Sequence, residues 1–140
     1  MNLEALETSF DLVAPRGDEL MDEFYGRLFE AAPGVIPLFA RTDLRAQKTM
    51  LLGTLVLLRQ SLRNLDAIVP KLRELGARHV AYGAQPEHYP VVGEVLIASM
   101  ATIAGTAWKP EYEAAWSEAF GVAAGAMIEG AEAAAMEAAA

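Results

Sequence analysis

Cysteine is absent from this chain of 140 residues, and histidine occurs twice, at His79 and His88. Without thiols the chain can form no disulfide, no zinc–thiolate centre and no covalent Cys-x-x-Cys-His cofactor attachment. Basic residues are also scarce, at eleven against nineteen acidic residues, which gives a net charge of -8. This charge repels phosphate backbones, so we expect no nucleic-acid partner.

Signals for secretion or membrane insertion are also lacking. The N-terminus carries Glu4, Glu7 and Asp11 without a basic start, which is unlike a signal peptide. The longest continuous apolar run, at 50–58, is too short to cross a bilayer. We therefore expect a cytoplasmic protein without membrane insertion, with residues 1–140 forming one domain.

The hydrophobic pattern predicts an all-α protein. Alternation of polar and apolar residues is not sustained anywhere, whereas apolar spacings of three and four recur along the chain. Capping residues, prolines and glycines predict a helix from Asn2 or Thr8 to near Pro15, a second within 17–34, a single-turn element and corner within 34–43, a helix from the cap Asp43 to about Asn64, one from Leu65 to Gly83, a proline-containing loop within 84–90, a helix to about Ala104, and a last helix from Pro110. We expect the alanine-rich tail beyond Glu132 to fray, since it has little to bury.

His79 ends an apolar stripe at steps of three and four residues, so it should point inward. The stripe consists of Leu65, Ile68, Leu72, Leu75 and His79. A lone histidine on such a face is usually a core residue bonded to a backbone carbonyl. Other segments, however, contain residues suited to the walls of one flat apolar pocket: Tyr25, Phe39, Gln47 and Leu51. On the last helix, the predicted inward face consists of Tyr112, Trp116, Phe120, Ala123 and Met127.

Four stretches together resemble the globins, in particular the bacterial flavohaemoglobin-type haemoglobins and their single-domain members. The stretches are "FYGRLFEAAPGVIPLF" (24–39), "AQKTMLL" (46–52), "LRELGARHVAYGAQPEHYPVVGEVL" (72–96) and "AWSEAFGV" (115–122). The most specific piece is "RHVAYG" followed by "HYPVVG". The resemblance covers essentially the whole chain, and it implies a globin fold of about six to eight helices in a three-over-three arrangement around a haem pocket.

The resemblance also implies roles for individual residues. His79 is similar to the proximal ligand of the iron in a non-covalent haem b, and Phe39 to the aromatic that packs flat on the haem. Tyr25 and Gln47 resemble the distal hydrogen-bond donors to bound dioxygen, and Leu51 resembles the apolar residue that closes the distal side. Each of these residues taken alone could instead be ordinary core or surface.

One position departs from the family. The resemblance implies a tyrosine and a glutamate around the proximal histidine, and Tyr89 matches the tyrosine. The glutamate position, counted from Trp116, falls on Ala131, with Glu129 and Glu132 nearby. Unless a bent last helix brings Glu132 in, we expect His79 to donate to the carbonyl of Leu75 or to a hydroxyl.

Further candidates carry weaker signals. His88 is expected to be a solvent-exposed residue at a helix start. Arg78 and Arg41 flank the predicted pocket and could pair with haem propionates, although arginines at a helix rim are usually solvated. Met50 and Met100 could ligate haem iron in principle, but methionines at helical spacing usually fill cores.

The function predicted from this set is reversible binding of dioxygen, with carbon monoxide or nitric oxide competing, by a monomer or homodimer. Whether the protein is also an enzyme stays open. The alternative is a nitric oxide dioxygenase that depends on a separate reductase, because no Gly-rich dinucleotide-binding motif occurs and we expect no reductase domain. A third possibility is a haem-free globin-like sensor in which His79 is structural.

Overall fold

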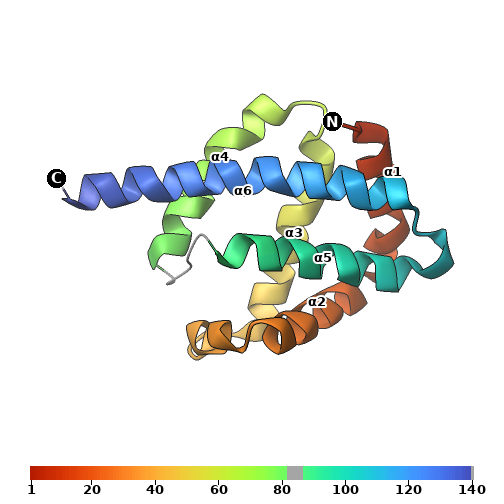
Figure 1. Ribbon diagram of the computed structural model, residues 1–140, viewed down its shortest axis with the longest axis horizontal. Helices are drawn as coiled ribbons and strands as arrows, with labels where there is room; N and C mark the ends of the chain where they lie inside the picture. The colour runs from red at the N-terminus through yellow and green to blue at the C-terminus, as the bar shows by residue number, and fades with distance from the viewer. Residues whose placement is uncertain (82–86, 140) are drawn as a thin grey trace.

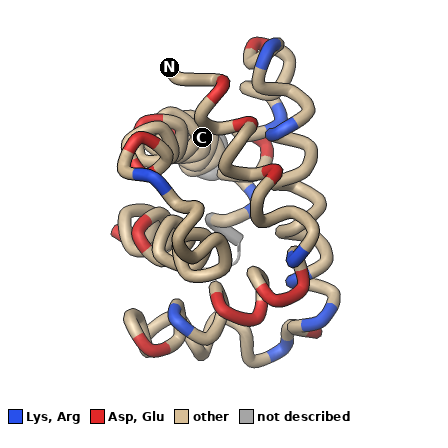
Figure 2. Tube along the Cα trace, turned by 90° about the vertical axis from the view of Figure 1, so that its right-hand side faces the viewer, with Lys and Arg blue, Asp and Glu red and all other residues tan. Residues whose placement is uncertain are grey.

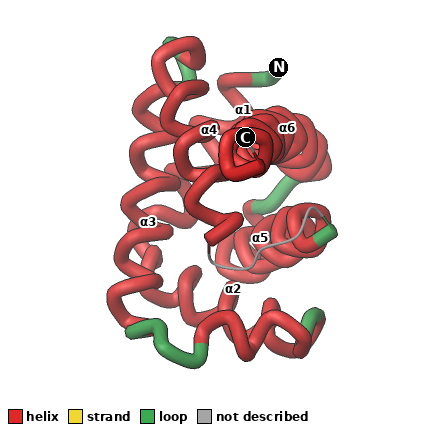
Figure 3. The backbone as a smooth tube through the Cα atoms, turned by 90° about the vertical axis from the view of Figure 1, so that its left-hand side faces the viewer, coloured by secondary structure: helices red, strands yellow, loops and turns green. Residues whose placement is uncertain are grey.

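The computed structural model describes residues 1–81 and 87–139. Within them lie six α-helices, three 3-10 helices and no strand. The α-helices are α1 (Leu3–Val13), α2 (Gly17–Ala31), α3 (Leu44–Ser61), α4 (Leu65–Ala81), α5 (His88–Ala104) and α6 (Pro110–Ala139); the 3-10 helices are η1 (Ala14–Arg16), η2 (Pro33–Phe39) and η3 (Gly105–Ala107). Figure 3 shows the described segments outside the helices as short stretches. The all-α prediction is confirmed.

Local chemistry explains several helix boundaries. Asn2 caps α1 by accepting from the amide of Ala5 at 3.1 Å, and Asp43 caps α3 by accepting from the amides of Arg45 and Ala46. After α5 the backbone turns at Gly105, whose φ of 60° lies in the region that favours glycine. Gly83, the predicted end of α4, and the loop residues 84–86 lie outside the described residues.

The helices pack in crossing pairs around one core. The closest packing joins α4 with α6 and α2 with α5, and α6 also packs against α1 and α5. In Figure 1, α5 and α6 lie side by side and α3 crosses behind them. Side chains of Leu6, Phe10, Leu20, Met21 and Met100 are nearly inaccessible at the centre.

Polar contacts connect the outer helices. Arg59 on α3 bonds Asp11 on α1 at 3.0 Å, and Arg63 bonds Glu7 at 2.7 Å. In the core, the indole of Trp116 on α6 donates to the Ser9 hydroxyl on α1 at 2.8 Å. In the part of the chain that the structure describes, no buried side-chain nitrogen or oxygen lacks a hydrogen-bond partner.

Three boundaries differ from the predictions. The corner after α2 is a 3-10 helix of seven residues rather than a single turn, and Pro37 within it lacks the amide that would let the chain continue as a regular α-helix. Helix α3 ends at Ser61, three residues before Asn64. The tail beyond Glu132 was predicted to fray, yet α6 stays helical to Ala139 although Met136 is 74% exposed. Alanine has the highest helix propensity, which accounts for a helix with little to bury.

Helix α5 is unusually apolar. His88–Ala107, a segment of 20 residues with a mean hydropathy of 1.5, is long and apolar enough to cross a membrane by length and composition. The prediction based on 50–58 overlooked it because Gly93 and Glu94 interrupt its apolar run. In the fold, α5 packs against α2 and α6, and Val95, Leu96 and Met100 are buried there. Only 28% of this apolar window is buried in the fold, so the packing uses part of its apolar surface.

Candidate functional site

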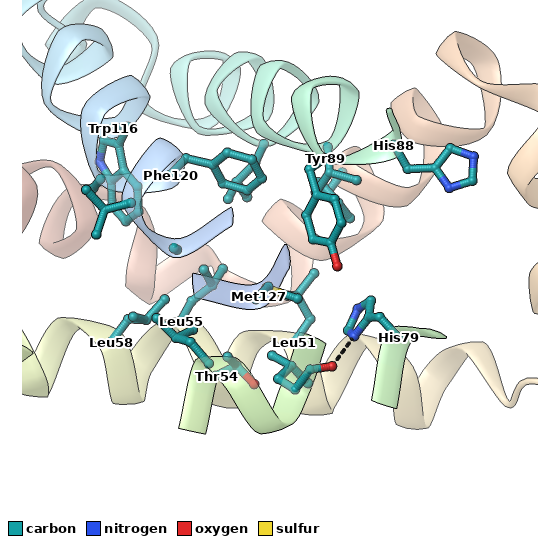
Figure 4. Close-up of a pocket in the computed structure, with 18 of the residues that line it drawn as sticks. Leu51, Thr54, Leu55, Leu58, His79, His88, Tyr89, Trp116, Phe120 and Met127 are labelled. Atoms are coloured by element: carbon teal, nitrogen blue, oxygen red, sulfur yellow. Dashed lines mark hydrogen bonds between the residues drawn. The ribbon is translucent and has the colours of Figure 1, made fainter. Parts of the chain in front are cut away.

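A cavity of about 420 Å³ lies between the helices and is lined almost entirely by apolar side chains. All five residues of the α4 stripe line it, as do Trp116, Phe120, Ala123 and Met127 of α6. Figure 4 shows that side chains from α3, α4, α5 and α6 border it. The inward faces predicted for α4 and α6 therefore surround a common space.

His79 is fixed by the backbone of its own helix. Its Nδ1 lies 2.7 Å from the carbonyl oxygen of Leu75, one turn earlier, which is the contact drawn as a dashed line in Figure 4. Because a carbonyl can only accept, Nδ1 carries the proton, and a neutral ring then keeps its lone pair on Nε2. Bonding to the Leu75 carbonyl, one of the two predicted alternatives, is confirmed.

Tyr89 packs beside His79. The two ring centroids are 6.5 Å apart with the planes tilted by 35°, and Tyr89 is buried at the start of α5. Burial raises the pKa of the Tyr89 phenol. His88 begins α5 as predicted, but it is half-buried and borders the cavity rather than being fully exposed. Figure 4 shows the His88 ring beyond Tyr89, turned away from Phe120 and Trp116.

Tyr25 and Gln47 come together at the cavity from two helices. Tyr25 on α2 is 3% exposed, and Gln47 on α3 is half-buried; both line the cavity. Burial raises the pKa of the Tyr25 phenol, and a hydrogen bond from Gln47 opposes part of that rise. Tyr25 and Gln47 are therefore two neutral polar groups that lie close together in apolar surroundings.

Phe39 and Leu51 border the same region. Phe39, at the end of η2, meets Tyr25 edge to face at 5.9 Å and Phe29 at 5.4 Å between ring centroids. Leu51 lies one turn after Gln47 on α3 and lines the cavity. The 3-10 corner thus holds an aromatic ring at the cavity wall, in contact with the Tyr25 ring.

The remaining candidate residues differ in whether they border the cavity. Arg78 borders the cavity and bonds Glu74 at 2.7 Å, whereas Arg41 is exposed and is not part of the cavity wall. Met100 is fully buried core, as expected of a methionine at helical spacing. Met50 lies at the cavity rim and is 53% exposed, so it fills no core.

The two acidic residues near Ala131 lie on the same helix. Glu129 bonds Arg73 at 3.0 Å and is largely exposed, and Glu132 is exposed. Ala131 itself is half-buried. Whether one of them serves His79 stays a prediction.

Some residues that line the cavity were not predicted from the sequence. Thr54, Leu55 and Leu58 continue the α3 wall beyond Leu51, and their spacing of three and four residues could have indicated them. Val92 on α5 lines the cavity as well, but the uniform hydrophobicity of that helix hides its inward face. Among described residues, no group of three or more His, Cys, Asp or Glu side chains could hold a metal ion.

Comparison with known sequences gives a consistent family. The family model described as Globin matches residues 22–127. A flavohemoprotein of Bacillus subtilis is 30% identical over 128 residues, which cover 90% of this chain and 32% of that protein. A flavohemoprotein of Rhodopirellula baltica is 35% identical over 112 residues, 79% of this chain and 28% of that protein. The chain thus spans about a third of the length of the curated relatives it matches.

Solved structures share the fold. A bacterial globin from Campylobacter jejuni superposes with a TM-score of 0.79 at 23% identity, covering 93% of this chain and 94% of the other. An engineered carbene transferase, made from an assumed nitric oxide dioxygenase of Rhodothermus marinus, gives a TM-score of 0.79 at 24% identity over 96% of this chain and 97% of that one.

Proposed function

This chain belongs to the globin family, and we propose that it holds a non-covalent haem b and binds dioxygen reversibly. Carbon monoxide and nitric oxide would compete for the same place. His79 is the proposed iron ligand, Tyr25 and Gln47 the hydrogen-bond donors to the gas, and Leu51 the residue that closes that side. The family likeness implies haem binding, and the residues of this cavity support the finer assignment.

The donor set fits a haem. An iron porphyrin is a large flat apolar group that brings its own metal, so a site for it needs apolar walls and one axial ligand rather than a cluster of ligands. The cavity of about 420 Å³ has such walls, including the Phe39 ring, and His79 borders it with Nδ1 held by the Leu75 carbonyl. Metal-ligating histidines are commonly oriented by a hydrogen bond from their second ring nitrogen, and the contact of Nδ1 with the Leu75 carbonyl is of this kind.

One observation carries the gas-binding role: the hydroxyl of Tyr25 and the amide of Gln47 meet at the wall of an otherwise apolar cavity. Haem, when bound, would supply an iron that can hold a diatomic gas. Dioxygen held at this site would take up partial negative charge and so gain from nearby donors, whereas carbon monoxide would gain less. The phenol of Tyr25 is neutral near pH 7 and can donate a hydrogen bond, and the Gln47 amide lies beside it.

The visible absorption spectrum tests the proposal. The purified protein is loaded with haem and measured as the ferric, dithionite-reduced and air-exposed ferrous forms, in parallel with His79→Ala. We expect a Soret band, a five-coordinate ferrous spectrum and a reversible change in air, all weakened or lost in the variant. A parent that retains no haem, or a variant with the parent's spectra, would contradict the proposal and favour a structural His79.

A second candidate function is nitric oxide dioxygenation. The relatives are named flavohemoproteins and are about three times as long as this chain, which is the observation that favours it. In this alternative residues 1–140 act as one cytoplasmic globin domain served by a separate reductase. Steady consumption of nitric oxide with an added flavin reductase and nicotinamide cofactor would support it. Consumption of a single equivalent by the oxygenated protein, without turnover, would support oxygen binding alone.

A further inference from the structure

Helices α4 and α6 cross at two glycines. An added Cβ at Gly76 on α4 would overlap the backbone carbonyl of Met127, and one at Gly130 on α6 would overlap the backbone carbonyl of Arg73. Each glycine thus faces the main chain of the opposite helix, and both are buried. Because backbone cannot rotate aside as a side chain can, any larger residue at either position has to separate the helices.

The crossing lies on the turn that holds His79. Leu75 precedes Gly76 and supplies the carbonyl that bonds His79 Nδ1 at 2.7 Å. Met127, opposite Gly76, lines the cavity that His79 borders. The imidazole, the carbonyl that orients it and the backbone of α6 therefore form one closely packed unit.

Other helical glycines provide a contrast. An added Cβ at Gly121 or Gly125, on the same helix α6, would meet no heavy atom within 4 Å. A glycine inside a helix lowers stability relative to alanine. At Gly76 and Gly130 the close approach of two backbones offsets that cost, whereas Gly121 and Gly125 have no such contact.

We propose that Gly76 and Gly130 are positioning residues for the iron ligand: the close crossing that they permit sets how far His79 reaches into the cavity. This inference rests on the proposed function, in which His79 binds haem iron. The glycines touch neither haem nor gas; they act through the position of α4.

The test compares Gly76→Ala and Gly130→Ala with Gly125→Ala as the matched control on α6. The iron–histidine stretching band of the ferrous protein is measured by resonance Raman spectroscopy, and haem loss by transfer to an acceptor globin. We expect both crossing variants to shift the band and to lose haem about tenfold faster, since overpacking at backbone displaces the helix. The control should keep the parent's band and rate.

General loss of stability must be separated from positioning. Gly93→Ala on α5 serves for this, because the nearest contact of its methyl would be the Phe120 side chain, at 2.6 Å from Cδ1, rather than the backbone of a neighbouring helix. We expect Gly93→Ala to lower the melting temperature while the iron–histidine band stays in place. If Gly93→Ala shifts the band as much as Gly76→Ala does, the effect is ordinary overpacking and the inference fails.

The last part of the test uses a variant in which the iron ligand is not attached to α4. In His79→Gly, free imidazole can serve as the iron ligand without attachment to α4. We expect Gly76→Ala to leave the band unchanged in this background, and a shift that persists would overturn the inference. An unchanged band in Gly76→Ala and Gly130→Ala with His79 present would also overturn it. If His79→Gly keeps the parent's spectrum without added imidazole, the proposed function itself fails, whatever the glycine variants do.

Discussion

Tyr25 brings a hydroxyl to a cavity wall that is otherwise nearly all hydrocarbon. A phenol in such a place is costly without a partner, and Gln47 supplies one. Both groups are neutral, so the pair polarises the cavity without placing a net charge in it. This suits a bound gas that takes up partial negative charge, because donors aimed at its outer atom stabilise it without reorganisation.

Tyr25→Phe should raise the dissociation rate of dioxygen about tenfold or more. The hydrogen bond lost is to a partly charged acceptor, and about 1.4 kcal/mol corresponds to a factor of ten. Stopped-flow displacement of dioxygen by carbon monoxide measures this rate. Carbon monoxide dissociation is the internal control and should change less. A dioxygen rate equal to that of the parent would remove Tyr25 from the gas-binding role.

The raised pKa of Tyr25 also predicts a loss of stability in alkali. In the unfolded chain the phenol ionises near its ordinary value of 10.0, whereas in the folded protein burial raises the pKa above it. Between the two values the unfolded state has lost a proton that the folded state keeps, so the free energy of unfolding falls as the pH rises past 10. Urea unfolding at pH 9 to 11 should show a smaller fall in Tyr25→Phe. An equal fall of the free energy of unfolding with pH in the parent and in Tyr25→Phe would show that Tyr25 does not cause the alkaline loss of stability.

At the scale of single helices, α3 carries one side of the site on its first turns. Its cap is Asp43, and Gln47 follows four residues later, so the order of the first turn governs the position of the Gln47 amide. Leu51 and Leu55 extend the same face into the cavity wall. The capping interaction of Asp43 at the surface is thereby linked to the position of the half-buried Gln47 amide.

Asp43→Ala should lower the free energy of unfolding by about 1 kcal/mol, since two amides of α3 lose their acceptor. It should also raise the dioxygen dissociation rate, though less than Tyr25→Phe does, by loosening Gln47. Urea denaturation and the displacement assay measure the two effects. Asp43→Asn, which keeps a capping oxygen, is the control. An alanine variant as stable as the parent would show that α3 needs no cap.

A second prediction for a single helix concerns Ala131 on α6. Ala131 is half-buried where the family resemblance implies a glutamate, while Glu129 is bonded to Arg73 and Glu132 is exposed. Ala131→Glu should raise the iron–histidine stretching frequency, because a carboxylate near the imidazole would make it a stronger ligand. Ala131→Gln, which lacks the charge, is the control. No shift in the glutamate variant would mean that this position does not control the proximal side.

At the scale of the whole molecule, periodicity predicted the two helix faces that border the cavity. The Leu65 to His79 stripe and the Trp116 face were readable because apolar side chains recur every three or four residues. The Gly76 and Gly130 crossing was not readable, since a glycine adds nothing to a hydrophobic pattern and its role depends on a helix more than fifty residues away. The ion pair between Arg73 and Glu129 could not be predicted either, because the two residues are distant in the sequence and meet only in the fold.

Charge is also a property of the whole molecule. Figure 2 marks the charged positions, and several acidic and basic residues pair, as Lys48 does with Asp22 at 2.9 Å. The charge is uneven along the chain, because α6 carries six glutamates and no Lys or Arg. The prediction that nucleic acid is not a partner stays a prediction, and it follows from the long-range repulsion between the net charge of -8 and phosphate backbones.

The central cavity makes stability depend on its occupant. A folded chain with about 420 Å³ of apolar space forgoes packing that haem would provide, and a ligand that binds the folded state alone stabilises it by mass action. Free haem at a hundred times its dissociation constant would add about 2.7 kcal/mol. For a chain of this size that is a rise in melting temperature of about 10 °C.

Differential scanning calorimetry of the apoprotein with and without added haem measures the rise, and His79→Ala, which lacks the axial bond but keeps the apolar walls, should show a smaller one. Equal rises in the parent and His79→Ala would mean that the walls alone hold the haem and that His79 contributes nothing to retention.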